Sequence, residues 1–170
     1  MIYLSFMRHA ESGFKDYDCD DFSRPISSEG ELTTKNVSRF LRKEQNYFDL
    51  VFCSPALRAK QTLYCLIESL YKKPPEIIED YNLYEGNEEN FLLRISKIQK
   101  SKNILVLTHE PQISYFINYF LAHTKPNQEF LNFDFVTSCL VTLEFNVRKW
   151  SEISIYNVVL KRFLDPNELS

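Results

Sequence analysis

The sequence lacks the features that mark several classes of protein. No run of Lys and Arg is longer than two residues and the formal net charge is −3, so we expect no broad basic surface for nucleic acid or an anionic membrane. A membrane-spanning helix needs about 20 consecutive apolar residues, and no stretch of the sequence approaches that length. The opening residues MIYLSFMRHAES become polar too soon for a signal peptide. We therefore expect a cytoplasmic protein with neither nucleic-acid nor membrane partners.

Cysteine and histidine are too few and too widely spaced to suggest a metal site or a disulfide framework. The four cysteines, Cys19, Cys53, Cys65 and Cys139, form no C-x-x-C pair, and a free thiol in an apolar run behaves as a small hydrophobic group. The three histidines occur in no H-x-H or H-E-x-x-H pattern. We expect reduced thiols, no metal ion, and a surface position for His123 near the end of a helix.

The chain has the size and composition of one globular domain. It has 170 residues, of which 44% are hydrophobic and 25% charged, enough to bury a sizeable core. No internal repeat or low-complexity linker divides it. We expect residues 1–170 to form a single domain.

Short apolar runs alternate along the chain with segments of helical periodicity. Strands are predicted at 1–7, 49–53, 76–79 and 103–109, helices from 28, over 54–71, near 90–99 and from 111, and a terminal hairpin over 135–145 and 153–163. Strands that alternate with helices of this length imply βαβ crossovers and a mostly parallel sheet. We therefore predict an α/β fold of three layers, α/β/α, with a C-terminal β-hairpin.

Two of the predicted helices carry start signals. Ser28 with Glu31 three residues later is a capping-box pattern. Ser54 is placed to cap the next helix, with Pro55 at its first position. These signals predict one helix that begins at Ser28 and another that begins at Pro55 after the Ser54 cap. The residues over 80–90 are predicted to form a loop.

Polar side chains follow three of the predicted strands. Arg8 and His9 follow the first, Ser54 and Arg58 the second, and His109 follows the buried run NILVLT. Because ligands of parallel α/β sheets bind at the carboxyl ends of the strands, we expect these groups to converge there. Arginine binds phosphate oxygens bidentately, histidine can act as nucleophile, acid or base, and a helix N-terminus offers free N–H groups. The pattern predicts a site for a dianionic phosphoryl group.

A single histidine beside a strand end is more often a structural residue than a catalyst. Two histidines with two arginines are harder to explain in that way, because burying them without an anionic partner would cost several kcal/mol. A metal site is the competing chemical interpretation, and the spacing of the histidines and cysteines does not favour it.

The motifs that contain these residues resemble those of the histidine phosphatase superfamily, also called phosphoglycerate mutase-like. MRHAES resembles its R-H-G motif, CSPALRAKQT its S-x-x-x-R-A-x-Q-T segment, and VLTHEP its second-histidine motif, in the same order. SRPISSEG resembles the R-P-L-[ST]-x-x-G segment. The short chain and LYEGNEENFL are similar to the small SixA-type phosphohistidine phosphatases. The resemblance implies a phosphoglycerate mutase-like fold.

The sequence departs from the family pattern at two places. Ala10 replaces the glycine that is most common after the histidine, which asks only that this position not need a positive φ. Gly13 and the two residues after it follow Ser12 without the asparagine of the mutase-type continuation, so a sugar-phosphate mutase is disfavoured.

The resemblance also implies roles for individual residues. His9 would attack phosphorus and form a phosphohistidine intermediate that water hydrolyses, while Arg8, Arg58 and His109 would hold the phosphoryl oxygens. No cofactor is implied, since a metal-free site draws its positive charge from side chains. Arg24, in SRP, would be a further phosphate or substrate contact, or else a solvated loop arginine near the acidic DCDD run.

A proton donor would separate two possible enzyme functions. The candidates are Glu85 in LYEG and, less favoured, Glu11 or Glu88, and Glu85 could equally be a solvated loop carboxylate. An alkoxide leaving group needs an acid, whereas an imidazole leaves more readily. The SixA-like resemblance implies a site without a dedicated acid.

We therefore expect a phosphatase acting on phosphohistidine in a signalling or phosphotransfer protein, with inorganic phosphate as product and inhibitor. The alternatives are a phosphatase of a small phosphomonoester and a catalytically silent module that binds phosphate or phosphoprotein. The silent module would retain the arginines and lose the nucleophile, whereas this chain has both His9 and His109.

Overall fold

One mixed sheet organises the protein. The computed structural model describes residues 1–13, 20–122 and 135–169, so Cys19 and His123 lie outside the described residues. The strands are β1 (Ile2–Arg8), β2 (Leu50–Cys53), β3 (Glu76–Glu79), β4 (Asn103–Thr108), β5 (Leu140–Phe145) and β6 (Val158–Leu164). Their order across the sheet is β3-β2-β4-β1-β5-β6. The first four are mutually parallel, and β5 runs antiparallel to both β1 and β6.

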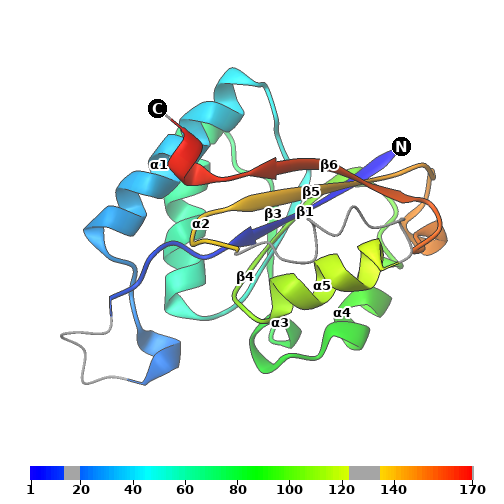
Figure 1. Cartoon of the computed structure of the whole chain (residues 1–170), viewed down its shortest axis with the longest axis horizontal. Helices are drawn as coiled ribbons and strands as arrows, with labels where there is room; N and C mark the ends of the chain where they lie inside the picture. The colour runs from blue at the N-terminus through cyan, green and yellow to red at the C-terminus, as the bar shows by residue number, and fades with distance from the viewer. Residues whose placement is uncertain (14–19, 123–134, 170) are drawn as a thin grey trace.

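The helices lie on both faces of this sheet. They are α1 (Ser28–Lys43), α2 (Leu57–Leu70), α3 (Asn82–Glu85), α4 (Glu88–Ile95) and α5 (Gln112–Leu121), with the short 3₁₀ helices η1 (Asp21–Ser23), η3 (Trp150–Glu152) and η4 (Pro166–Glu168). α1 and α2 cover one face, and α3, α4 and α5 cover the other (Figure 1). The predicted three-layer α/β/α architecture is therefore confirmed.

Alternating side chains of the strands feed two separate cores. Phe6 of β1 stacks on Phe116 of α5, with ring centroids 5.0 Å apart. Its neighbour Met7 faces the other way and packs in a cluster with Leu41 of α1 and Leu66 of α2. All of these side chains are fully buried. This two-sided burial explains why the central strands read as continuous apolar runs.

α1 begins at Ser28 as predicted, but its capping residue and the start of α2 differ from the prediction. Ser27, not Ser28, caps α1, because the extended Ser27 accepts a hydrogen bond from the Gly30 N–H at 3.0 Å. α2 begins at Leu57, with Ala56 at the cap position and no side-chain cap. Ser54 does not start this helix, because the backbone is still non-helical at Ala56, with φ −57° and ψ 139°. The Ser54 N–H bonds to the Leu107 carbonyl and so continues the β2–β4 ladder.

The segment predicted as a loop over 80–90 contains the one-turn helix α3. Asp80 accepts a hydrogen bond from the Asn82 N–H at 3.0 Å, and Gly86, at φ 80°, ends the turn in the left-handed region. A single turn is too short to show helical periodicity, so sequence patterning missed it. α4 then begins two residues before the predicted start at 90, after the Asn87 cap, and ends before 99.

The C-terminal hairpin is confirmed, with shorter strands than predicted. β5 pairs with β6 from Leu140 opposite Leu164 to Phe145 opposite Val158. Residues 135–139 do not join β5, because Ser138 has a φ of 62° that turns the chain. The Ser138 N–H instead bonds to the carbonyl of His9 at 3.2 Å, which brings this turn beside the end of β1.

Candidate active site

A pocket of about 650 Å³ opens at the carboxyl ends of β1 and β4. Its lining includes Arg8, His9, Arg24, Arg58 and His109. These residues come from distant parts of the chain. Arg8, His9, Arg58 and His109 were expected at this edge because they follow the strands, and Arg24 was expected from the family resemblance. The structure therefore brings together the predicted nucleophile and all four predicted oxyanion-binding residues; their roles stay predictions.

His9 is held in one orientation by backbone groups. The backbone N–H of His9 donates to the Thr108 carbonyl at 2.9 Å, which fixes the residue against the end of β4. Its ring Nδ1 lies 2.7 Å from the Ala10 carbonyl oxygen, so in a neutral imidazole Nδ1 carries the proton. Nε2 is then left with its lone pair free. The φ of Ala10 is not positive, so alanine can stand here in place of the family's glycine without backbone strain.

The two histidines of the pocket share an electrostatic environment that keeps them neutral. Burial lowers the pKa of His9 to about 4, and the nearby charges of Arg58 and Arg8 act in the same direction, against the raising effect of the Ala10 hydrogen bond. Burial likewise lowers the pKa of His109 to about 4, helped by Arg58 and opposed by Asp21. Neutral imidazoles at physiological pH leave the positive charge of the site to its arginines.

Arg8, the last residue of β1, and Arg58, which follows β2, are each anchored by a backbone carbonyl. Arg8 Nη1 donates to the Phe135 carbonyl at 2.6 Å. Arg58, in the first turn of α2, is 4% exposed. Thr62, one turn later, donates its hydroxyl to the Arg58 carbonyl and accepts the Ala10 N–H. The α2 turn that positions Arg58 is thereby tied to the residue after His9.

Asp21 joins two of the guanidinium groups. Its Oδ1 lies 2.7 Å from Arg24 Nη2 and its Oδ2 lies 2.9 Å from Arg58 Nη2. Although partial burial opposes the shift, hydrogen bonds and charge from Arg24 and Arg58 lower the pKa of this carboxyl. Two guanidinium groups, each through one Nη, thus bind the same carboxylate, so the space between them already holds an oxyanion.

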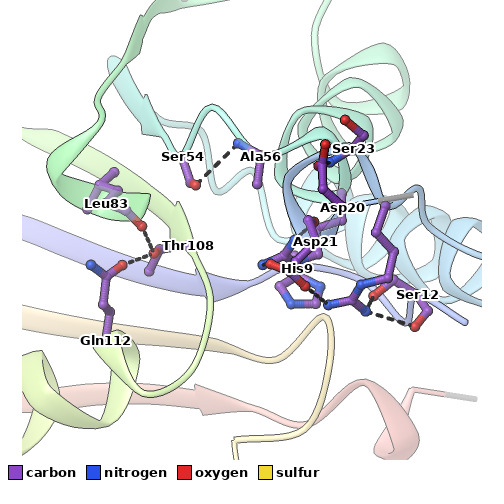
Figure 2. Close-up of polar contacts among 12 residues, drawn as sticks. His9, Ser12, Asp20, Asp21, Ser23, Ser54, Ala56, Leu83, Thr108 and Gln112 are labelled. Atoms are coloured by element: carbon purple, nitrogen blue, oxygen red, sulfur yellow. Dashed lines mark hydrogen bonds and ion pairs between the residues drawn. The ribbon is translucent and has the colours of Figure 1, made fainter. Parts of the chain in front are cut away.

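Arg24 is a pocket residue rather than a solvated loop arginine. It is 9% exposed, and its Nη1 donates to the carbonyl of Ser12 at 3.1 Å and to the Ser12 hydroxyl. His9, Ser12 and Asp21 lie together in the close-up of this region (Figure 2). Arg24 is therefore positioned where it could make the predicted contact with phosphate or substrate.

Two of the predicted site residues lie outside the pocket lining. Ser54 is fully buried, and its hydroxyl turns toward the Ala56 N–H at 3.4 Å (Figure 2). Glu85, at the end of α3, is exposed, and neither it nor Glu88 lines the pocket. Glu11 does line it, but its carboxylate accepts a hydrogen bond from the Ser27 hydroxyl.

Sequence reasoning missed five lining residues, namely Ser12, Asp21, Tyr84, Glu110 and Thr137. Glu110 directly follows His109 and could have been found by the same strand-end argument. Thr137 belongs to the turn that was predicted as strand, and Tyr84 to the unpredicted helix α3. Among the described residues, no three of His, Cys, Asp and Glu gather in a cluster able to hold a metal ion.

Comparison with solved structures identifies the fold. A putative phosphohistidine phosphatase SixA from Agrobacterium tumefaciens superposes with a TM-score of 0.79 at 18% identity, over 97% of this chain and 98% of that one. A SixA protein histidine phosphatase complexed with tungstate gives 0.76 at 18% identity, over 99% and 100%. A putative alpha-ribazole-5'-P phosphatase from Escherichia coli gives 0.71 at 18% identity, over 98% of each chain. The chain therefore has the fold of the SixA phosphatases and of the wider histidine phosphatase superfamily.

A sequence relative is also found. An uncharacterized protein of Picosynechococcus sp. is 30% identical over 112 residues, which are 65% of this chain and 67% of that protein. The chain belongs to the same family as this Picosynechococcus protein. No protein-family model matches the chain.

Proposed function

We propose that the protein is a metal-independent phosphatase with His9 as its nucleophile. One observation carries the proposal. A neutral imidazole with Nε2 free lines a pocket together with three guanidinium groups. Phosphoryl transfer depends on positioning and on charge neutralisation more than on covalent assistance, and this pocket supplies both from side chains.

The reaction proceeds in two displacements. His9 Nε2 attacks phosphorus, the bond to the leaving group breaks, and a phosphohistidine forms. Water then attacks that intermediate and releases inorganic phosphate. Arg8, Arg58 and Arg24 neutralise the phosphoryl oxygens, and His109 donates a hydrogen bond from its neutral ring.

The substrate we propose is a phosphohistidine on a signalling or phosphotransfer protein, with inorganic phosphate as product and inhibitor. The SixA-like fold supports this class of substrate. So does the exposed position of Glu85 outside the pocket, because an imidazole leaving group does not need a dedicated acid. A second candidate is a small phosphomonoester, which is favoured by the Glu110 carboxyl in the lining and by the ribazole phosphatase fold match.

Turnover of a phosphohistidine-bearing protein, measured beside a panel of small phosphoesters, tests these proposals. We expect hydrolysis of the phosphohistidine, inhibition by phosphate or tungstate, and an acid-labile, base-stable phosphate on His9. The His9→Ala protein should still bind tungstate without turnover. Parent-rate turnover by His9→Ala would refute the nucleophile. Binding without turnover by the parent would instead identify a phosphate-binding module.

The proposal places the enzyme in the cytoplasm. Its support is the thiols of Cys53, Cys65 and Cys139, which are free in the structure and would be kept reduced there. Cell fractionation tests this location. Within the described ranges, no helix combines the length and apolarity needed to cross a membrane.

A further inference from the structure

One aromatic ring interrupts the polar lining of the pocket. Tyr84, in α3, is the only Phe, Tyr or Trp among the described residues that line it. Its ring centroid lies 6.0 Å from that of His109, with the ring planes at 60°. It also lies 5.0 Å from the ring of Phe22, edge to face at 88°. Tyr84 is thus held between a ring of the proposed phosphate site and a ring of η1.

The backbone that carries Tyr84 is fixed to the end of β4. The hydroxyl of Thr108 lies 2.9 Å from the Leu83 carbonyl oxygen and 2.5 Å from Gln112 Oε1 (Figure 2). Gln112 Nε2 donates in turn to the Asn82 carbonyl at 3.0 Å. Because Thr108 directly precedes His109, the same hydrogen bonds connect the α3 backbone that carries Tyr84 to the strand end that carries His109.

The rest of the lining offers little to the organic part of a substrate. Apart from the histidines and arginines it consists of Glu11, Ser12, Asp21, Glu110 and Thr137. In an in-line displacement the leaving group lies on the side of phosphorus away from His9 Nε2. Carboxylates and hydroxyls give a flat ring no apolar face there, whereas aromatic rings attract one another in edge-to-face or offset-stacked arrangements.

We propose that Tyr84, supported by Phe22, is the surface against which the leaving group lies, and that it makes the site selective for an aromatic leaving group such as the imidazole of phosphohistidine. The inference rests on the proposed phosphatase function and specifies its substrate class. Tyr84 takes no part in the bond changes. The phosphorus–nitrogen bond of the substrate breaks, the bond from His9 Nε2 forms, and the departing imidazole keeps the electron pair and takes a proton from water.

The test compares two small substrates that both have a phosphorus–nitrogen bond. Phosphoimidazole carries a ring and phosphoramidate does not, and the intrinsic difference in reactivity between them cancels when the ratio of their kcat/KM values in a variant is divided by the same ratio in the parent. Tyr84→Leu should lower this ratio about three- to tenfold, the range expected for one aromatic pair. Tyr84→Phe keeps the ring and should restore the ratio. Tyr81→Leu is the matched control, since Tyr81 is exposed, next to α3 and outside the lining.

A second variant and a second measurement complete the test. Phe22→Leu removes the ring that supports Tyr84. It should also lower the ratio of kcat/KM values, although Phe22 belongs to η1 and Tyr84 to α3. If Tyr84→Leu and Phe22→Leu both leave the ratio unchanged, the inference is wrong. If the parent protein turns over neither compound, the proposed function fails. In that case the dissociation constants of phosphoimidazole and phosphoramidate are measured in the same variants. A preference for phosphoimidazole that falls in Tyr84→Leu supports the role of Tyr84, and an unchanged preference contradicts it.

Discussion

The carboxylate of Asp21 lies 2.9 Å from Nη2 of Arg58, and the backbone carbonyl of the same aspartate accepts a hydrogen bond from Arg58 Nη1 at 2.6 Å. Arg58 is buried, and its Nε has no hydrogen-bond partner among the described residues. The other carboxylate oxygen holds Arg24. Asp21 therefore occupies the two guanidinium groups that a phosphoryl group would need. A dianionic ligand must share them with this carboxylate or displace it.

Neutralising Asp21 should strengthen anion binding. In Asp21→Asn the side chain keeps its shape and loses the charge that repels a dianion, so we predict that the dissociation constant for tungstate or phosphate falls about three- to tenfold. Titration calorimetry measures it, with Glu89→Gln, which is exposed and outside the pocket, as the charge-matched control. Weaker anion binding by Asp21→Asn would show that Asp21 serves chiefly to orient the arginines.

The titration of the two pocket histidines should depend on Arg58. Burial is the larger cause of their low pKa values, and the Arg58 charge adds to it. We predict NMR midpoints near pH 4 for His9 and His109 in the free protein. In Arg58→Gln both midpoints should rise, but they should stay below the ordinary histidine pKa of 6.5 because the rings are still buried. Single His→Gln variants assign the signals. Midpoints near 6.5 in the parent would contradict the buried, neutral state of these rings.

The same pKa values predict how stability depends on pH. Between the ordinary value of 6.5 and the folded value of about 4 the unfolded chain binds more protons at His9 and His109 than the folded protein does. The free energy of unfolding should therefore fall as the pH is lowered through this window, by about 1 kcal/mol or more per pH unit. The free energy of unfolding is measured by urea denaturation at several pH values. In the double variant His9→Gln/His109→Gln, in which the carboxylates still titrate, it should depend less steeply on pH than in the parent. Equal slopes would count against the prediction.

The placement of the catalytic candidates was predictable because it needs only the strands. Arg8 is the last residue of β1, His9 directly follows it, and His109 directly follows β4, so recognising two apolar runs was enough to place these side chains at one edge. Arg58 needed one further assumption, a helix after β2. That helix begins two residues later than predicted, at Leu57 instead of Pro55, and Arg58 still lies within its first turn.

The remaining features depend on contacts between distant segments. Asp21 meets Arg58 across 37 positions of sequence, and neither periodicity nor a strand end signals such a pairing. Ser27 and Ser28 have the same capping chemistry, so only the backbone geometry decides between them. Tyr84 rather than its neighbour Glu85 lines the pocket because of the orientation of α3, a single turn without its own sequence pattern.

Gly30 should be needed for the close approach of α1 to the segment after His9. A Cβ at this position would contact the backbone carbonyl of Glu11, and it would lie 2.9 Å from the Glu11 nitrogen and 3.1 Å from the Ala10 Cβ. Alanine in a helix is favoured over glycine by about 1 kcal/mol, but we predict that Gly30→Ala destabilises the protein by about 1–3 kcal/mol through overpacking. At Gly13 a Cβ would meet nothing within 4 Å, so Gly13→Ala should be nearly neutral. Urea unfolding compares the two variants, and a stabilised Gly30→Ala protein would be the contrary result.

The two carboxylates near the pocket should differ in their effect on phosphoester hydrolysis. Glu85 is exposed and outside the lining, whereas Glu110 is half-buried, lines the pocket, and accepts a hydrogen bond from the Ser114 N–H at 3.3 Å. A general acid is worth about 10²- to 10⁴-fold for an alkoxide leaving group and is not needed for an imidazole. We predict that Glu85→Gln leaves phosphohistidine hydrolysis within a few-fold of the parent, and that Glu110→Gln slows alkyl phosphoester hydrolysis more than phosphohistidine hydrolysis. Steady-state kinetics of both variants on both substrates, at matched melting temperature, measure this. A hundredfold loss of phosphohistidine turnover in Glu85→Gln would make Glu85 catalytic, and the small phosphomonoester would then become the better candidate substrate.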